Sequence, residues 1–544
     1  MRRTVLTGFS FLACASVSGA AFGATRLVGP GQTYAKPCAA FAAAGQGDIV
    51  EIDARGNGTY DGDVCAITVN NLTIRGTNGR AHIDAAGKNA QGKAIWVIQG
   101  NDTVVENIEF SGASVPDLNG AGIRADGRNL TLRNCYFHDN QEGILGGAGE
   151  VLIDSTEFAR NGNCIDPSGC AHNMYISQST TKFTLQYSYS HSVTDGHLVK
   201  SRAVQNFILY NRLTGEAGTD SYEINLPNAG TSYIIGNLIQ QGPQSGNSAI
   251  LDYGSEGATN AGKDLYVVNN TFVNDRGSGT FVSIAGGVTV PAVVKNNIFL
   301  GGGTLVSQSS AVLANNFSGQ NPMLANRAGF DYHLLAGSPC ANAGVDPGTS
   351  SSGFALLPTA QYVHPLGHEA RTSVGTIDIG AYELGGGSAG TSGTGGSAGT
   401  SGTGGGAGTS GTGGSAGTGT GGNSGTAGAG GSAGTGPDGS AGTGTATGGA
   451  SGSGAGGAGA TGGIGGSAAS AGVAGSSGAG GAGKGGASGN RSAGGTSAAN
   501  PDAAADDGGC GCRVPTGSRD GALAWAFALL AASARAWRLS RSPR

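Results

Sequence analysis

A short pattern of apolar and polar positions recurs along much of the chain. Each copy is an alternating apolar run that ends in asparagine and is followed by an apolar or aromatic residue. The clearest copies are 103–110, 130–137, 151–158 (with serine in place of asparagine), 207–211, 233–237, 265–272, 292–299 and 311–315. Asn107 and Asn134 are 27 residues apart, and Asn211 and Asn237 are 26 apart. This spacing predicts one repeated structural unit rather than a set of unrelated strands.

The alternation predicts how each unit is buried. A period of two places Val, Ile and Leu on one side of a strand. A single coil of short strands cannot bury that side, whereas coils stacked about 4.8 Å apart bury all of these side chains in one core. An asparagine at the same bend of every coil can hydrogen-bond to its copies above and below. We therefore interpret the asparagines as structural residues of an all-β solenoid.

The repeat resembles the right-handed parallel β-helix of pectate-lyase-like proteins, over about residues 50–320. The resemblance implies a single-stranded right-handed parallel β-helix of about ten coils within residues 25–384. It also implies an N-terminal cap at 34–44 and a closing segment made of 331–340 and 378–383. A left-handed hexapeptide-type helix would have shorter, more regular coils, and a β-propeller would have four strands in each repeat. Both are therefore disfavoured.

Composition separates this folded part from the rest of the chain. Many of the 107 glycines fall in a tract of Gly, Ser, Thr and Ala between about residues 385 and 500. Such a tract cannot bury enough apolar surface to offset its chain entropy, so we predict a disordered linker at 385–509. The net charge of −5 gives none of the basic footprint of a nucleic-acid-binding protein. We expect a monomer that does not bind nucleic acid.

Both ends of the chain carry targeting patterns. Residues 1–24 begin with two arginines, continue with an apolar run and end in small residues, which is typical of a secretory signal peptide. Residues 510–544 hold Cys510 and Cys512, then a short Ala- and Leu-rich segment and four arginines. This order resembles the C-terminal sorting tag of myxobacterial surface proteins. The resemblance implies export, processing or anchoring at Cys510 or Cys512, and attachment to the envelope membrane at the cell surface, with 385–509 as a tether.

Six cysteines lie between residues 25 and 384. In an oxidising compartment they can pair. Cys38–Cys65 would join the N-terminal cap to the first coil, and Cys164–Cys170 would close a loop; we treat both pairings as hypotheses. The cysteine spacings show no zinc-binding pattern.

A second set of strands aligns in the middle of the repeat. Placing Met174, Val199, Ile224 and Leu251 in one inward column gives steps of 25, 25 and 27 residues. The neighbouring positions then form an outward column of Tyr175, Lys200, Asn225 and Asp252. Beside this column we expect Asn173, Glu223 and Arg202, also facing outward, while His172 and His197 take inward positions as partly buried, hydrogen-bonded residues.

This outward strip suggests chemistry on an extracellular polysaccharide. A lyase that cuts uronic-acid polymers needs a cation for the substrate carboxylate, a base for the C5 proton and an acid for the leaving oxygen. Arg202, Lys200 and Tyr175 would take these three catalytic roles, with Asn173, Glu223, Asn225 and Asp252 binding substrate. In chondroitinase-B-like and alginate-lyase-like β-helices the catalytic Lys and Arg lie on adjacent coils, whereas here they share one strand.

Other interpretations of the strip stay open. Lys200 can instead pair with Asp252 or Glu223 in a surface ion network. No dense acidic cluster offers a Ca²⁺ site, so we expect no cofactor and no metal. The protein is then a polysaccharide lyase, a non-catalytic glycan-binding adhesin or a passive structural protein of the cell surface.

Overall fold

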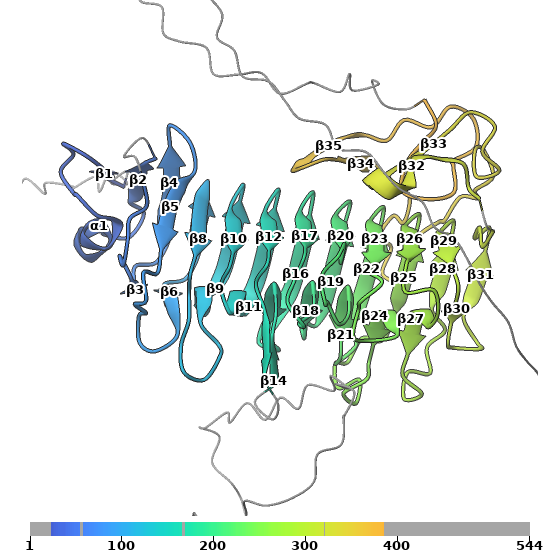
Figure 1. The fold of residues 1–544 in the computed structure, drawn as a ribbon, viewed down its shortest axis with the longest axis horizontal. Helices are drawn as coiled ribbons and strands as arrows, with labels where there is room; N and C mark the ends of the chain where they lie inside the picture. The colour runs from blue at the N-terminus through green and yellow to red at the C-terminus, as the bar shows by residue number, and fades with distance from the viewer. Residues whose placement is uncertain (1–22, 55–57, 166–168, 320, 386–544) are drawn as a thin grey trace, which may run out of the picture. The chain divides into compact units, whose positions relative to one another are not determined.

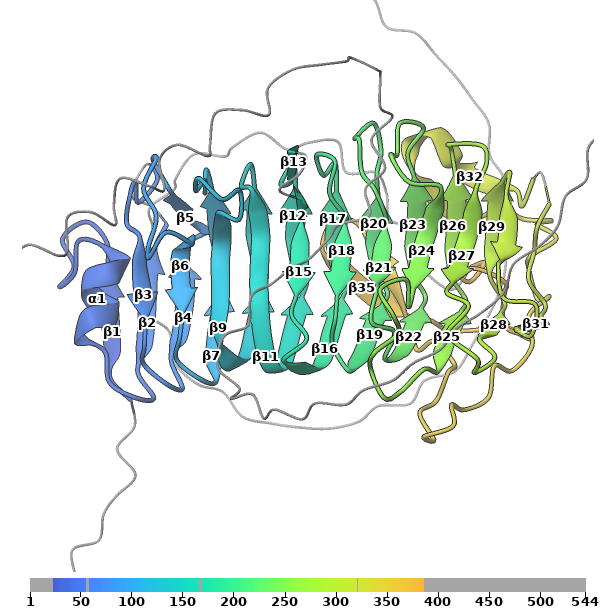
Figure 2. The same cartoon turned by 90° about the horizontal axis from the view of Figure 1, so that it is seen from below.

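We describe the protein from a computed structural model, in residues 23–54, 58–165, 169–319 and 321–385. Three parallel sheets wind around a common core, and successive coils stack on one another (Figures 1 and 2). A complete coil contributes one strand to each sheet, in the chain order sheet 1, sheet 2, sheet 3. The predicted right-handed parallel β-helix is confirmed.

The strands of sheet 1 are β3 (Cys65–Ile67), β6 (Ala94–Ile98), β15 (Met174–Ile176), β18 (Val199–Ser201), β21 (Ile224–Leu226), β24 (Ala249–Tyr253), β27 (Thr280–Ile284) and β30 (Thr304–Val306). The strands of sheet 2 are β1 (Thr25–Val28), β2 (Ile49–Asp53), β4 (Thr73–Thr77), β7 (Thr103–Glu106), β16 (Thr180–Gln186), β19 (Gln205–Leu209), β22 (Thr231–Ile235), β25 (Leu265–Val268), β28 (Val293–Lys295) and β31 (Val312–Ala314). Two longer strands, β9 (Ala121–Arg133) and β11 (Glu142–Asp154), run through both sheets. The strands of sheet 3 are β5 (Ala81–Asp84), β8 (Ile108–Ser111), β10 (Tyr136–His138), β12 (Glu157–Ala159), β17 (Tyr189–His191), β20 (Arg212–Thr214), β23 (Leu238–Gln241), β26 (Thr271–Asn274) and β29 (Ile298–Gly301).

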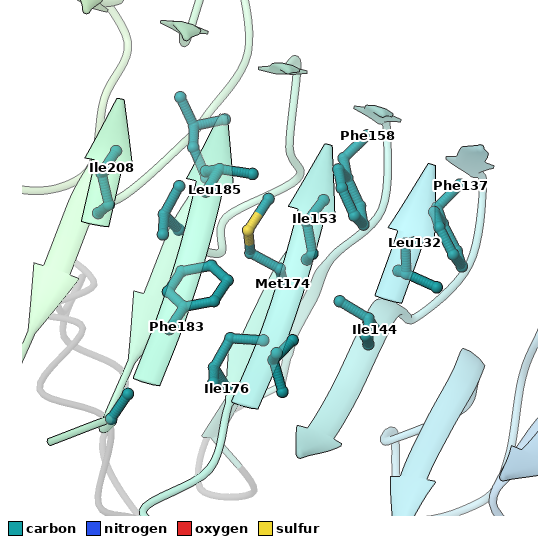
Figure 3. Close-up of a cluster of buried hydrophobic side chains, with 14 of the residues drawn as sticks. Leu132, Phe137, Ile144, Ile153, Phe158, Met174, Ile176, Phe183, Leu185 and Ile208 are labelled. Atoms are coloured by element: carbon teal, nitrogen blue, oxygen red, sulfur yellow. The ribbon is translucent and has the colours of Figure 1, made fainter. Parts of the chain in front are cut away.

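In the core, similar side chains from successive coils stack on one another. Phe110, Phe137 and Phe158 are fully buried, with ring centroids 4.9 Å apart from one coil to the next. This distance is close to the spacing of hydrogen-bonded strands, so aromatic stacking and strand pairing reinforce each other. Figure 3 shows Phe137 and Phe158 together with an aliphatic column of Leu132, Ile153, Leu185 and Ile208 on successive coils. Period-two burial therefore produces one continuous core.

The first coil is covered by a short helix, α1 (Pro37–Ala43). Pro37 lies in its first turn, where the missing N–H costs no helical hydrogen bond. Ala40 and Phe41 are buried, and the Phe41 ring meets Trp96 edge-on at 5.0 Å. The helix therefore shields the end of the core from water, as the sequence predicted for residues 34–44.

In the copies at 103–110, 130–137 and 265–272, the recurring asparagine occupies a left-handed bend between sheets 2 and 3. Asn107, Asn134 and Asn269 have φ angles of 60°, 49° and 52°. Asparagine tolerates this region better than most residues other than glycine. Gly236 takes the same bend at φ 69°, and a Cβ there would lie 2.5 Å from the Tyr210 ring. Ser155, Tyr187 and Tyr210 occupy the same bend at φ 47°, 54° and 56°, so the bend favours asparagine or glycine but does not require them.

The residue after this bend forms a buried amide ladder. Asn211 donates from Nδ2 to Oδ1 of Asn237 at 3.0 Å, Asn237 to Asn270 at 2.9 Å, and Asn270 to Asn297 at 3.0 Å. All four are fully buried. The sequence analysis predicted a ladder of the recurring asparagines at the bend, and two of them, Asn211 and Asn237, belong to the buried ladder. The bend residues do pair, as Asn134 does with Asn107 at 3.0 Å, but the continuous buried ladder lies one position later.

The remaining elements lie outside the coils. Strands β13 (Asn163–Ile165) and β14 (Gly169–Ala171) form an antiparallel hairpin. The structure contains disulfides between Cys38 and Cys65 and between Cys164 and Cys170, the two pairings considered above. The C-terminal elements are β32 (Leu324–Asn326), the 3₁₀ turn η1 (Arg327–Gly329), β33 (Asp331–Leu334), β34 (Ala360–Val363) and β35 (Gly367–Ala370).

This C-terminal segment folds back over the outer surface of the β-helix. Tyr332, Cys340 and Tyr382 pack with Leu238 and Ile298 of sheet 3. Leu356 packs against tyrosines of sheet 2, with Phe354 partly buried at the edge of the same cluster. The segment was expected to close the domain. It does so by covering outward positions that are apolar in the later coils, because those side chains would otherwise face water.

Several sequence predictions lie outside the described residues. These are the signal peptide at 1–24, nearly all of the linker at 385–509 and the tail at 510–544 with Cys510 and Cys512. Within the part of the chain that the structure describes, no helix combines the length and apolarity needed to cross a membrane.

We predict that Asn237→Ala lowers the free energy of unfolding. Removing this amide leaves the buried Asn211 backbone N–H without its acceptor and takes one hydrogen bond from each of the Asn211 and Asn270 amides, at a total cost of about 2–4 kcal/mol. Urea unfolding followed by circular dichroism measures the change. Asn119→Ala, at an exposed asparagine, is the control and should have little effect; equal losses in both variants would contradict a structural role for the ladder.

Candidate functional site

The aligned strip on sheet 1 has the register that the sequence predicted. Tyr175 pairs with Lys200, Lys200 with Asn225, and Asn225 with Asp252, each on the next coil. The adjacent residues Met174, Val199, Ile224 and Leu251 are fully buried in the core. Stacking therefore brings Tyr175, Lys200, Asn225 and Asp252 together on the outer side of sheet 1.

Lys200, Arg202 and Tyr175 form one cluster. The Lys200 ammonium lies 4.8 Å from the centre of the Tyr175 ring, and Arg202 Nε donates to the Tyr175 hydroxyl at 2.8 Å. Lys200 is only 2% exposed and Arg202 9%. The cations are therefore enclosed by protein and stabilised by the face and hydroxyl of one tyrosine.

The Arg202 guanidinium already forms hydrogen bonds to other side chains of the protein. Its Nη1 donates to Asn228 Oδ1 and its Nη2 to Glu256 Oε2, both at 2.6 Å. Burial disfavours the charged form, but the hydrogen bonds and charges of Tyr175 and Glu256 outweigh it and raise the pKa of Arg202. An incoming uronate carboxylate would have to displace Glu256 from this guanidinium.

Asn225 and Asp252 form a second polar pair on the same strip. Asn225 Nδ2 donates to Asp252 Oδ2 at 2.7 Å, and Ser255 Oγ donates to the same oxygen at 2.5 Å. Burial raises the pKa of Asp252 even though these hydrogen bonds favour the carboxylate. The amide and the carboxylate are thus already engaged with each other.

The sequence alignment wrongly predicted that Asn173 and Glu223 face outward. Asn173 and Glu223 are fully buried. Asn173 accepts a hydrogen bond from Asn161 Nδ2 at 3.0 Å and donates to Ser190 Oγ at 3.0 Å, so it belongs to an internal amide ladder. The error arises at the bend before each strand, where two successive residues can both be buried and strict alternation fails. In this conformation neither side chain is accessible to a polysaccharide.

His172 and His197 are buried, as expected. Their rings stack at 4.4 Å on neighbouring coils, and His172 Nδ1 accepts a hydrogen bond from the His197 backbone at 3.0 Å. They support the coil stack rather than line an open surface.

Glu223 shares its interior position with a second acid. Burial, and then the nearby Asp220 carboxyl group, raise the pKa of Glu223 well above its usual value. Burial also raises the pKa of Asp220. The pair therefore favours the protonated form in the folded protein.

A polar surface that the sequence analysis missed lies on sheet 3, and most of its side chains are partly exposed, although Tyr189 and Arg212 are each only 7% exposed. Its outward positions follow the buried ladder and alternate with the core residues. They include the following residues: His82, Glu109, Tyr136, His138, Glu157, Tyr189, His191 and Arg212. The signal was present in the early repeats, since Phe110 lies between Glu109 and Ser111, and Phe137 lies between Tyr136 and His138.

Between sheet 3 and the C-terminal segment this surface is hollowed. One cavity of about 610 Å³ is lined by Arg212, Phe330, His333, Tyr362 and His364, among others. A second, of about 670 Å³, is lined by Glu216, Gln240, Asp275 and Phe330, among others. Phe330 contributes to both. We call these two cavities together the sheet 3 groove.

The groove is built on a fixed charged centre. The Arg212 guanidinium lies between the rings of Tyr189 and Phe330, 4.7 and 4.8 Å from their centres, and its Nη2 bonds Glu216 at 3.1 Å. Tyr189 also donates its hydroxyl to Glu216. Burial opposes ionisation of Glu216, but hydrogen bonds from His191 and Tyr189 and the charge of Arg212 lower its pKa to about 2.

Carboxylates outnumber cations along the groove. The charged lining residues are Arg212, Glu216, Asp275, Asp331, Glu369 and Glu383. Aromatic rings lie beside them: Phe330 is half-buried, and the exposed His333 ring stacks on Tyr382 at 3.7 Å. Acceptors next to ring faces suit a ligand that has many hydroxyl donors and flat apolar faces.

One family model and several solved structures are similar to parts of this chain. A family model described as a right handed beta helix region matches residues 57–239. Pectate lyase Pel9A is 16% identical, with a TM-score of 0.46 over 67% of this chain and 98% of its own. The alginate lyase AlyGC of the PL6 family is 14% identical, with a TM-score of 0.30 over 63% and 60%. A pectin methylesterase from Aspergillus niger is 10% identical, with a TM-score of 0.24 over 59% and 92%. No match was found among curated proteins.

We predict that Glu223 makes stability fall as pH rises. Because its folded pKa is raised, the unfolded chain loses this proton first, near pH 4.3, and stability declines from there until the folded pKa is passed. Glu223→Gln should lack this component, so its advantage over the wild type should grow with pH. Melting temperatures across the pH range measure it. Glu150→Gln, at an exposed carboxylate, is the control; parallel wild-type and Glu223→Gln profiles would contradict the raised pKa.

Proposed function

We propose that this protein binds a neutral extracellular polysaccharide in the sheet 3 groove. The observation that carries the proposal is the pairing of exposed aromatic faces with a surplus of carboxylates in two adjoining cavities. Sugar hydroxyls donate to carboxylate oxygens, and the C–H faces of sugars pack on aromatic rings. A polyuronate would meet charge repulsion from Asp331 and Glu369, whereas the charge of Glu216 is balanced by Arg212.

The coil geometry favours a polymer over a single sugar. Outward side chains repeat on sheet 3 at the strand spacing of roughly 4.8 Å, which is close to the length of one sugar unit. A chain laid across the strands therefore meets the outward side chains of a new coil at about every sugar unit. Because Arg212 is held between two rings and Glu216, the centre of the groove needs little ordering on binding.

We predict that the protein is retarded in native gels containing neutral polysaccharides such as xylan, galactan or glucan, and less by pectate or alginate. Phe330→Ala and His333→Ala each remove a ring face and should weaken binding roughly 3–10-fold, for stacking worth about 0.5–1.5 kcal/mol. Leu313→Ala removes an exposed apolar side chain on β31, outside the groove, and should change nothing. Preferential retardation by polyuronates would contradict the proposal.

A second candidate function is uronate polysaccharide cleavage at sheet 1. It is favoured by the contact of Lys200 and Arg202 with one tyrosine, at 4.8 and 2.8 Å. Lys200 would act as base, Arg202 would bind the substrate carboxylate and Tyr175 would act as acid. The enclosure of Lys200 and the pairing of Arg202 with Glu256 count against it.

For this candidate, incubation with pectate, alginate, chondroitin and heparin-type polymers should release unsaturated uronate products, detected by ultraviolet absorbance. Lys200→Ala should abolish the product while leaving the circular dichroism spectrum unchanged. Lys182→Ala, at an exposed lysine of sheet 2, is the matched control. A wild type that yields no product, or a Lys200→Ala variant that remains active, would rule out this site.

We also propose that the protein is exported and held at the cell surface. The proposal rests on the signal-like residues 1–24, the Gly-rich tract and the Cys510 to Arg544 tail. Deleting residues 510–544 should release the protein into the medium, as seen by immunoblotting of cell and medium fractions. Unchanged association with the envelope would contradict anchoring by the tail.

A further inference from the structure

Three side chains converge on the outer face of sheet 3, at the opposite end from the groove. They are His82 on β5, Glu109 on β8 and His138 on β10. One ligand atom from each lies within 4.8 Å of the other two. Glu109 Oε1 is 3.0 Å from His138 Nε2 and 3.7 Å from His82 Nδ1. We propose that these residues form a binding site for a Zn²⁺ ion.

Stacking of three consecutive coils creates the cluster. His82 is directly opposite Glu109 in the register, and His138 is opposite Ser111, two residues further along the strand. All three side chains are a quarter exposed or less, at 25%, 25% and 14%. The ligands are 27 and 29 residues apart, which is no zinc-binding sequence motif, so only the folded coil brings them together.

His82 is oriented by a relay on its far side. Its Nε2 lies 2.7 Å from Ser111 Oγ, and this hydroxyl donates to Asp84 Oδ2 at 2.6 Å. Because the serine proton points to Asp84, Ser111 accepts from the Nε2–H of His82. The lone pair of the ring is then on Nδ1, the nitrogen that faces Glu109. This is the tautomer a metal ligand requires.

His138 is oriented in the same manner by a carboxylate. Its Nδ1 lies 2.6 Å from Asp139 Oδ2. Arg160 fixes Asp139 in turn, by hydrogen bonds of 3.0 and 2.8 Å to its two oxygens. When His138 donates its Nδ1 proton to Asp139, the nitrogen that remains as a metal ligand is Nε2, which faces Glu109. Carboxylate–histidine pairs of this kind orient histidine ligands and increase their basicity.

The ligand set selects the metal. Two imidazole nitrogens and one carboxylate suit Zn²⁺, whereas Ca²⁺ takes six or more oxygen ligands. Three protein ligands leave one tetrahedral position, which solvent can fill because the site is partly exposed. A bound ion would link three coils through their side chains and would stabilise this end of the helix.

A neighbouring histidine on the same sheet provides a control. His191 also contacts two carboxylates, but through different nitrogens: Nε2 is 3.2 Å from Glu157, and Nδ1 is 3.7 Å from Glu216. Among the described residues, His82, Glu109 and His138 form the group of three potential ligands that lie close enough to hold an ion, and His191 is not part of it. His191→Ala should therefore leave zinc binding unchanged.

The test is titration of the full chain, purified without a histidine tag, with Zn²⁺ by isothermal calorimetry. We expect one ion whose binding is weakened at least about tenfold by His138→Ala or Glu109→Gln. Asp139→Asn keeps all three ligands and should weaken binding by about 10–100-fold through loss of orientation. Co²⁺ added to the wild type should give the visible absorption of a low-symmetry four-coordinate site, and Ca²⁺ should not compete.

Three results would overturn the proposal. The first is no saturable Zn²⁺ binding below roughly 1 mM, an affinity too weak for a built site. The second is equal loss of binding in His191→Ala and His138→Ala. The third is unchanged binding in Glu109→Gln when circular dichroism shows that the variant is folded, because the ion would then bind elsewhere on the chain.

Discussion

The structure depends on the in-register stacking of its coils. Parallel strand pairing holds each coil on the next, and the fully buried ladder of Asn211, Asn237, Asn270 and Asn297 satisfies amides that would otherwise be costly inside the core. A slip of one residue would place core side chains in water and polar groups in the core. Register is therefore strongly determined, and like side chains align in columns along each face.

Function follows from what these columns present on the outside. On sheet 1 the column of Tyr175, Lys200, Asn225 and Asp252 is enclosed and largely satisfied by its own neighbours. On sheet 3 the outward column is more open and carries both proposed sites. At one end the C-terminal segment folds back and creates the groove around Arg212 and Phe330. At the other end His82, Glu109 and His138 converge, and the C-terminal segment contributes no residue to this cluster.

Much of this could be predicted from the sequence. The repeat identified the β-helix, and one alignment placed Tyr175 beside Lys200, because period-two burial and coil length are local properties. The sequence analysis misplaced Asn173 and Glu223 because the alternation of inward and outward residues fails at bends. The period of the repeat does not show where these bends lie. The groove depends on contacts such as Arg212 with Phe330, 118 residues apart, and the proposed zinc ligands meet only after three coils have stacked. Such distant contacts leave no motif in a single sequence.

The central claim is that the open face of sheet 3, and not the enclosed strip of sheet 1, meets the polysaccharide. Hydrogen–deuterium exchange with and without a neutral oligosaccharide tests it most directly. The account predicts slower exchange in residues 212–218, 329–334 and 362–369, which contribute to the groove, and no change near Lys200. Protection confined to residues 174–177 and 199–204 would contradict it.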